Sequence, residues 1–112
     1  MRTRLLLIVL ALLLCGAGTD ASQKKARKPV THTVTVDATS FQPAKLTVAP
    51  GDAVVWVNKD VIPHTATSKK AGVFDSGTIA TGKSWKSTFK TAGEFAYVCQ
   101  FHPTMNGTII VK

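Results

Sequence analysis

Short β-prone segments separated by turn residues run from residue 30 to the last residue, 112. Turn formers such as Pro50-Gly51-Asp52 and Thr91-Ala92-Gly93 recur about every 8 to 12 residues, a spacing typical of all-β domains. No segment has the periodicity of an amphipathic helix. We therefore predict an all-β protein, an antiparallel β-sandwich of about seven to eight strands. The expected strands are 30–38, 46–48, 53–58, 65–68, 74–77, 84–89, 94–99 and 107–111, with a break at 41–43.

Two of these segments show how deeply the strands are expected to be buried. Segment 53–58 is apolar on both faces, as in a central strand covered by a second layer. Segment 30–38 alternates, which is typical of a half-buried strand. Its predicted inward face consists of His32, Val34, Val36 and Ala38. Trp56 and Trp85 are interpreted as packing residues of the core.

The first residues carry the pattern of an export signal. Arg2 and Arg4 precede an unbroken apolar run from Leu5 to Leu14. Such a run rises only about 15 Å as a helix, roughly half of a bilayer core, so it is too short for a permanent membrane span. We predict a secretory signal peptide over 1–21, a basic flexible linker over 22–29 and one folded domain over 30–112, exported to the periplasm.

A lipid anchor is the alternative for the N-terminus. The stretch that ends in Cys15-Gly16 resembles a bacterial lipobox, although Leu14 stands where that pattern has a small residue. Lipidation of Cys15 would tie the protein to the membrane surface. Cleavage after Ala17 or Ala21 would remove this cysteine instead.

The chain is basic, and its charge bears on the kind of partner. Its 112 residues include 14 Lys and Arg against 6 Asp and Glu, a formal net charge of +8. This excess suits an acidic protein, an anionic membrane or a nucleic acid. Export makes nucleic acid an unsuitable partner.

Cysteine usage points to an occupied thiol. The sequence has two cysteines, and cleavage of the signal leaves only Cys99, so the mature chain has no intramolecular disulfide. A lone thiol in an exported protein is open to oxidation unless something protects it, and a bound metal would do so. Cys99 ends the predicted strand 94–99, on the same inward face as Phe95 and Tyr97.

A cysteine, a histidine and a methionine follow one another at intervals of three: Cys99, His102 and Met105. Thiolate, imidazole and thioether are soft or borderline donors, the set that favours copper among the first-row metals. Another imidazole, His64, lies in a loop after a proline. Because alternate loops gather at the same end of a sandwich, this loop can lie near the one that carries the other three donors. Structural zinc sites use four strong ligands and more cysteine, so Met105 argues against zinc. His32 has no partner motif and is expected to be structural or at the surface.

Several motifs in 30–112 together carry a family resemblance. They are Phe41-Gln42-Pro43, Leu46-Thr47-Val48, Pro50-Gly51-Asp52, Val55-Trp56-Val57-Asn58, the loop that ends in Pro63-His64, Gly93-Glu94-Phe95-Ala96-Tyr97-Val98-Cys99, and the terminal C-x-x-H-x-x-M-x-G. With these motifs the chain resembles the cupredoxins, or type 1 blue copper proteins, within the amicyanin and plastocyanin group. The resemblance implies a cupredoxin-type Greek-key sandwich.

The resemblance also implies the ligands of one type 1 copper ion. The equatorial ligands would be His64, Cys99 and His102, and the axial ligand would be Met105. The short spacing between the last three is similar to amicyanin rather than to plastocyanin. Thr65 stands where the family often has an asparagine that ties the ligand loops together, and Gln100 follows the cysteine. The hydrogen bonds between the loops, and with them the redox potential, are open at this point.

The implied function is electron transfer by a periplasmic, monomeric carrier. Electrons would pass through the exposed edge of His102, inside an apolar docking patch formed by Ile62, Pro63, Phe101 and Pro103. The expected partner is a redox protein such as a c-type cytochrome, an oxidase or a dehydrogenase with an acidic docking face. The alternative is a periplasmic copper-binding protein for storage, delivery or resistance. No residue pattern indicates an enzyme.

Overall fold

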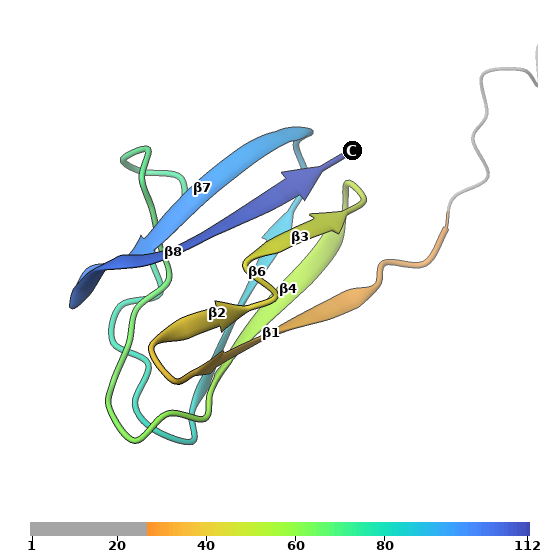
Figure 1. Ribbon diagram of the computed structural model, residues 1–112. Coiled ribbons are helices and arrows are strands. Elements are labelled where there is room, and N and C mark those ends of the chain that lie inside the picture. The colour runs from red at the N-terminus through yellow and green to blue at the C-terminus, as the bar shows by residue number, and fades with distance from the viewer. Residues whose placement is uncertain (1–26) are drawn as a thin grey trace, which may run out of the picture.

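The computed structural model describes residues 27–112, which form a two-layer β-sandwich (Figure 1). The predicted all-β sandwich is confirmed. Residues 27–112 contain no helix that could span a membrane. The predicted signal peptide, with Cys15, lies outside the described residues. The strands are β1 (Thr31–Asp37), β2 (Ser40–Gln42), β3 (Lys45–Val48), β4 (Asp52–Asn58), β5 (Thr67–Ser68), β6 (Ser84–Phe89), β7 (Gly93–Cys99) and β8 (His102–Val111).

The two sheets contain four strands each. One has the order β2-β1-β4-β6 and the other β3-β8-β7-β5. They are mixed rather than purely antiparallel, because β1 pairs with β4 and β3 pairs with β8 in parallel. A parallel pair needs a crossover connection. For β1 and β4, the chain makes this crossover by passing from β2 in the first sheet to β3 in the second and back to β4.

Some strand boundaries differ from the predicted ones. The stretch expected to be a break forms β2, which pairs with β1 across a tight turn. Ala38 lies in that turn and is exposed rather than inward. Segment 74–77 is not a strand, although Asp75 forms an isolated bridge with Thr67. The last strand, β8, begins at His102 instead of residue 107, because the backbone pairs with β7 directly after Cys99.

The core lies between the two sheets and is rich in aromatic rings. Trp56 of β4 and Tyr97 of β7 are fully buried and meet edge to face, with ring centroids 5.4 Å apart. Trp85 packs against this cluster from a half-buried position, so both tryptophans are core residues as predicted. Gly107 of β8 lies opposite Tyr97, whose ring occupies the space that a Cβ atom would need.

A buried carboxylate closes the end of the sandwich where β4 begins. Asp52, only 2% exposed, accepts hydrogen bonds from the backbone of Val30 and Ala49, each at 3.0 Å. It also binds the Arg27 guanidinium and lies 2.9 Å from His32 Nε2. These contacts hold the pKa of Asp52 well below its usual range, the Val30 N–H and His32 having the largest effects. His32 is thus a structural residue, and Arg27, in the predicted linker, fixes the start of the domain.

Candidate metal centre

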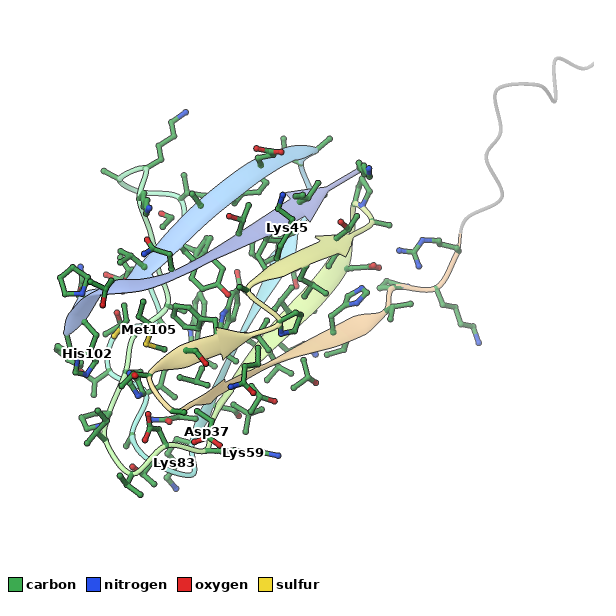
Figure 2. The ribbon with its side chains drawn as sticks, in the orientation of Figure 1. Asp37, Lys45, Lys59, Lys83, His102 and Met105 are labelled. Carbon is green, nitrogen blue, oxygen red and sulfur yellow. The ribbon has the colours of Figure 1, made fainter. Side chains whose placement is uncertain are left out.

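The predicted ligands gather at the other end of the sandwich. His64 lies in the loop between β4 and β5, Cys99 ends β7, and His102 and Met105 lie in the first part of β8. Figure 2 shows His102 and Met105 together at this end. The loop that carries His64 is fixed to Ile79 by two backbone hydrogen bonds, of 3.2 and 2.7 Å.

His64 and Cys99 come together with a spacing that suits a shared metal ion. Both side chains are fully buried, and His64 Nδ1 lies 3.7 Å from Cys99 Sγ. With metal–sulfur and metal–nitrogen bonds of about 2.3 and 2.0 Å, an S–metal–N angle of about 120° would separate the donors by about 3.7 Å. The backbone N–H of Thr65 donates a hydrogen bond to the same sulfur, 3.3 Å away.

Asp60 determines which nitrogen of His64 is available as a donor. Its Oδ2 lies 2.8 Å from His64 Nε2. An ionised carboxylate only accepts hydrogen bonds, so Nε2 carries a proton, and in the neutral imidazole Nδ1 then has its lone pair toward Cys99. Metal-binding histidines commonly donate their other N–H to a carboxylate in this way. Hydrogen bonds from the Thr39 N–H and from His64 hold the pKa of Asp60 below its ordinary value.

Asn58 shapes the loop from inside. Its side chain is fully buried, and its amide donates to the carbonyl groups of Ile62 (2.9 Å) and Ile79 (2.8 Å). Its oxygen accepts the backbone N–H of Asp60 at 2.9 Å. The amide and the oxygen of Asn58 therefore both have hydrogen-bond partners, and these bonds fix the start of the loop that leads to His64.

Thr65 connects the two ligand loops at the position where the resemblance left the hydrogen bonding open. Its hydroxyl accepts the backbone N–H of Gln100 at 2.9 Å and lies 3.0 Å from the hydroxyl of Thr67. A threonine thus supplies an oxygen acceptor between the loops. Because Gln100 contributes only its backbone here, its side chain does not decide the connection.

His102 lies beside His64, and Met105 lies at the same end of the sandwich as His102. The ring of His102 lies beside that of His64, with centroids 5.2 Å apart, and is half-buried. Met105 is buried in the same apolar cluster as Cys99. Within residues 27–112 no three His, Cys, Asp or Glu side chains form a closed metal-binding group. The side chains in direct contact are therefore His64 and Cys99, with the other two predicted ligands as their neighbours.

Exposed apolar residues stand next to His102 in the chain and just before His64 in its loop. Phe101 is 50% exposed, and Val61 is 87% exposed, the highest value for a large apolar side chain in the described residues. Pro63 and Pro103 are also exposed, whereas Ile62 is half-buried. Sequence reasoning missed Val61, as well as Asp60 and Asn58. The spacing of Asp60, four residues before a histidine in a loop, was the available signal for the carboxylate.

Comparison with known proteins assigns the family. The family model described as a cupredoxin-like domain matches residues 4–111. The chain belongs to the cupredoxin-like family. The predicted family resemblance is therefore confirmed.

Curated relatives and solved structures agree with this assignment. Amicyanin of Paracoccus versutus is 31% identical over 83 residues, which cover 70% of this chain and 63% of the relative. The chloroplastic plastocyanin of Tetradesmus obliquus is 36% identical over 84 residues, covering 64% and 58%. This cupredoxin thus spans less than two thirds of the length of either relative. A purple cupredoxin from Nitrosopumilus maritimus superposes with a TM-score of 0.69 at 26% identity, covering 72% of this chain and 99% of its own.

The residues at the site fit the copper ion expected of a cupredoxin. A buried thiol faces an imidazole lone pair at the spacing derived above, and a carboxylate fixes the tautomer of that imidazole. A second imidazole lies beside that of His64, a buried thioether lies at the same end of the sandwich, and the donor types match those of type 1 copper sites. A thiol, two imidazoles and a thioether from residues 64–105 thus lie at the same end of the sandwich, and their role as ligands is a matter for the proposal below.

Proposed function

We propose that this cupredoxin binds one type 1 copper ion through His64, Cys99, His102 and Met105 and carries single electrons between redox proteins. The contact of Cys99 Sγ with the unprotonated Nδ1 of His64 carries the proposal. Bound copper supplies a one-electron couple. The chain's own residues hold the donors in a buried, prearranged geometry, so that little rearrangement accompanies a change of oxidation state.

His102 provides the route by which electrons enter and leave. Of His64 and His102, it is the half-buried one, and the proposed apolar docking patch consists of Val61, Ile62, Pro63, Phe101 and Pro103, which stand near the two histidines in the chain. A small apolar patch with a polar edge suits brief encounters rather than a permanent complex. The proposed partner docks on this patch and exchanges electrons through the imidazole edge.

Charge favours an acidic partner. Residues 27–112 carry ten Lys and Arg against five Asp and Glu, and two of these acids, Asp52 and Asp60, are buried, so the exposed charge is predominantly positive. We propose a c-type cytochrome, an oxidase or a dehydrogenase with an acidic docking face as the partner. Electron exchange with an acidic cytochrome should slow as salt screens this attraction. A rate that is independent of ionic strength would contradict the charge argument.

The proposed location is the periplasm, with the N-terminal segment as export signal. Mass spectrometry of the exported protein tests this directly. Cleavage near Ala17 or Ala21 supports the signal peptide. A lipid-modified N-terminus at Cys15 would place the same domain on a membrane surface, and an uncleaved chain would contradict the proposal.

A visible spectrum tests the copper site. The apo protein titrated with Cu(II) should develop an intense blue or violet thiolate-to-copper band at one equivalent. Cys99→Ser should abolish the band, whereas His32→Gln, a change to the histidine at the far end, should retain it. A colourless protein that binds Zn²⁺ as tightly as copper would contradict the site.

Copper delivery is the competing function for the same ligands. It is distinguished by comparing electron exchange with a cytochrome against the transfer of Cu(I) to a chelator. The proposal expects fast electron exchange and slow loss of the metal. Rapid loss of copper with slow exchange would favour storage or delivery.

A further inference from the structure

The turn between β1 and β2 holds two neighbouring residues in the left-handed conformation. Ala38 has a φ of 49° and Thr39 a φ of 54°. Two-residue hairpin turns of this kind favour asparagine and glycine, and each other residue costs about 1–2 kcal/mol there. Both residues are exposed, so core packing does not account for the conformation.

The Thr39 N–H points toward the metal centre. It donates to Asp60 Oδ2 at 3.0 Å, the same oxygen that lies 2.8 Å from His64 Nε2. A backbone hydrogen bond of 2.8 Å from Lys59 to Val36 brings the two segments together just beside it. Asp37, where the turn begins, and Lys59 lie close together in Figure 2. One carboxylate oxygen therefore joins the turn to the buried histidine.

We propose that the Ala38–Thr39 turn tunes the metal centre: its Thr39 N–H shares Asp60 Oδ2 with His64 and thereby weakens His64 as a donor to copper. This inference rests on the proposed function. The turn acts through Asp60 and is a positioning element, since neither of its residues reaches the ligands themselves.

The direction of the effect follows from how the oxygen is shared. A donated N–H stabilises the negative charge on Asp60, so the carboxylate pulls less strongly on the imidazole proton. The imidazole then donates less electron density through Nδ1. Cu(II) is the harder ion and gains more from a strong imidazole donor than Cu(I) does. The turn therefore favours Cu(I) and raises the reduction potential.

A matched pair of substitutions at position 39 isolates the N–H group. In the full chain, Thr39→Ala keeps the amide, whereas Thr39→lactic acid replaces only that N–H by an ester oxygen. Both lose the threonine hydroxyl, which bonds locally to the Ala38 carbonyl and not to Asp60. We expect the ester variant to have the lower reduction potential. A threefold to tenfold gain in the preference for Cu(II) corresponds to about 30–60 mV for one electron.

Two further variants guard against a purely structural effect. Ala38→Gly with Thr39→Gly relieves the strain but keeps the N–H, so stability should rise while the potential stays unchanged. A glycine inserted between Ala38 and Thr39 lengthens the turn, displaces the N–H and should lower the potential. Equal potentials in the ester, insertion and Thr39→Ala variants would overturn the proposal.

The apo protein gives an independent readout. Nitrogen NMR of His64 should show the Nε2–H tautomer, with Nε2 shifted further toward imidazolate character in the ester and insertion variants. Identical His64 shifts in all variants would refute the shared-oxygen arrangement even without a metal. If these shifts were observed but no thiolate-to-copper band formed, the hydrogen-bond network would be supported and the proposed function contradicted.

Discussion

At the scale of single residues, the site depends on side chains whose hydrogen-bonding groups all have partners. Asp60 accepts from Thr39, Val61 and His64, and its two oxygens share these donors. An amide in its place would turn an NH₂ group toward an N–H donor in either orientation. Asp60 is therefore fixed in identity as well as in position.

Asp60→Asn should weaken copper binding about 10- to 100-fold, the usual cost of losing a partner of a metal-binding histidine. The asparagine either turns its NH₂ group toward Val61 and loses that bond, or turns it toward Thr39 and His64, where it loses the Thr39 bond, donates to Nε2 and drives the imidazole proton onto Nδ1. Competition with a Cu(I) chelator measures the affinity. Asp37→Asn, at the surface nearby, is the control and should bind as wild type; equal affinity in the two variants would argue against the role of Asp60.

Thr65 bridges the ligand loops by its hydroxyl. Thr65→Ala leaves the backbone N–H of Gln100 without its acceptor and should lower the free energy of unfolding by about 1 kcal/mol. Thr65→Ser keeps the oxygen and should lose less. Urea unfolding of the apo proteins measures both, and an alanine variant as stable as the serine variant would show that the bridge contributes little.

At the scale of elements, the pairing of β7 with β8 brings the ligands into place. β8 begins at His102, so its pairing with β7 fixes the path of the chain past Cys99. The register of this pair shifts between Val98 and Cys99. Further along the same pair, Tyr97 covers Gly107. The absence of a side chain at residue 107 lets the aromatic ring lie flat across the neighbouring strand.

Gly107→Ala should destabilise the sandwich by about 1–3 kcal/mol, because the new methyl group overlaps the Tyr97 ring, which is buried and cannot move freely. In a domain of this size, 1 kcal/mol lowers the melting temperature by about 4–8 °C. Thr104→Ala, at an exposed position of the same strand, should change it little. Equal melting temperatures for the two variants would contradict this packing.

The strands themselves were largely predictable because their signals are local. Alternation and turn residues placed β1, β4, β6 and β7 within one or two residues. The extension of β8 to His102 was not predictable from the sequence, since it arises from pairing with β7. The four donors were found from their chemical types and spacing, and their ligand role stays a prediction. The supporting hydrogen bonds of Asn58 and Asp60 join segments about 20 residues apart, so only the folded chain shows them.

At the scale of the whole molecule, the two ends of the sandwich have different roles. The ligand loops lie at one end, and the buried Asp52 joins Arg27, Val30 and His32 at the other. This second cluster holds the first described residues against β4. Its charge makes the stability of the entire domain sensitive to acid.

The folded state holds the pKa of Asp52 below its ordinary value of 3.8, so the unfolded chain binds a proton at this site more readily. The resulting stabilisation is complete well above pH 3.8 and is lost as the pH falls below it. Asp52→Asn should be less stable than wild type at pH 7 and should lose less stability between pH 5 and pH 2. Urea unfolding across this range tests it, and parallel curves for the two proteins would contradict it.

Asp37→Asn provides the comparison for that experiment. Asp37 is exposed, and its carboxylate accepts only the N–H of the next residue. We expect its pH profile to follow that of wild type.

β8 runs from the ligand end to the Asp52 end, where the Lys112 N–H bonds to the Val48 carbonyl. Both ends of the described chain leave the domain on the same side in Figure 1, and Figure 2 shows His102 at the opposite side. A protein attached to an electrode or a bead through Lys112 would face the solution with the loops that carry the proposed ligands. Immobilised in this way, every molecule would offer the same surface to a soluble partner, and a fused domain would leave that surface open.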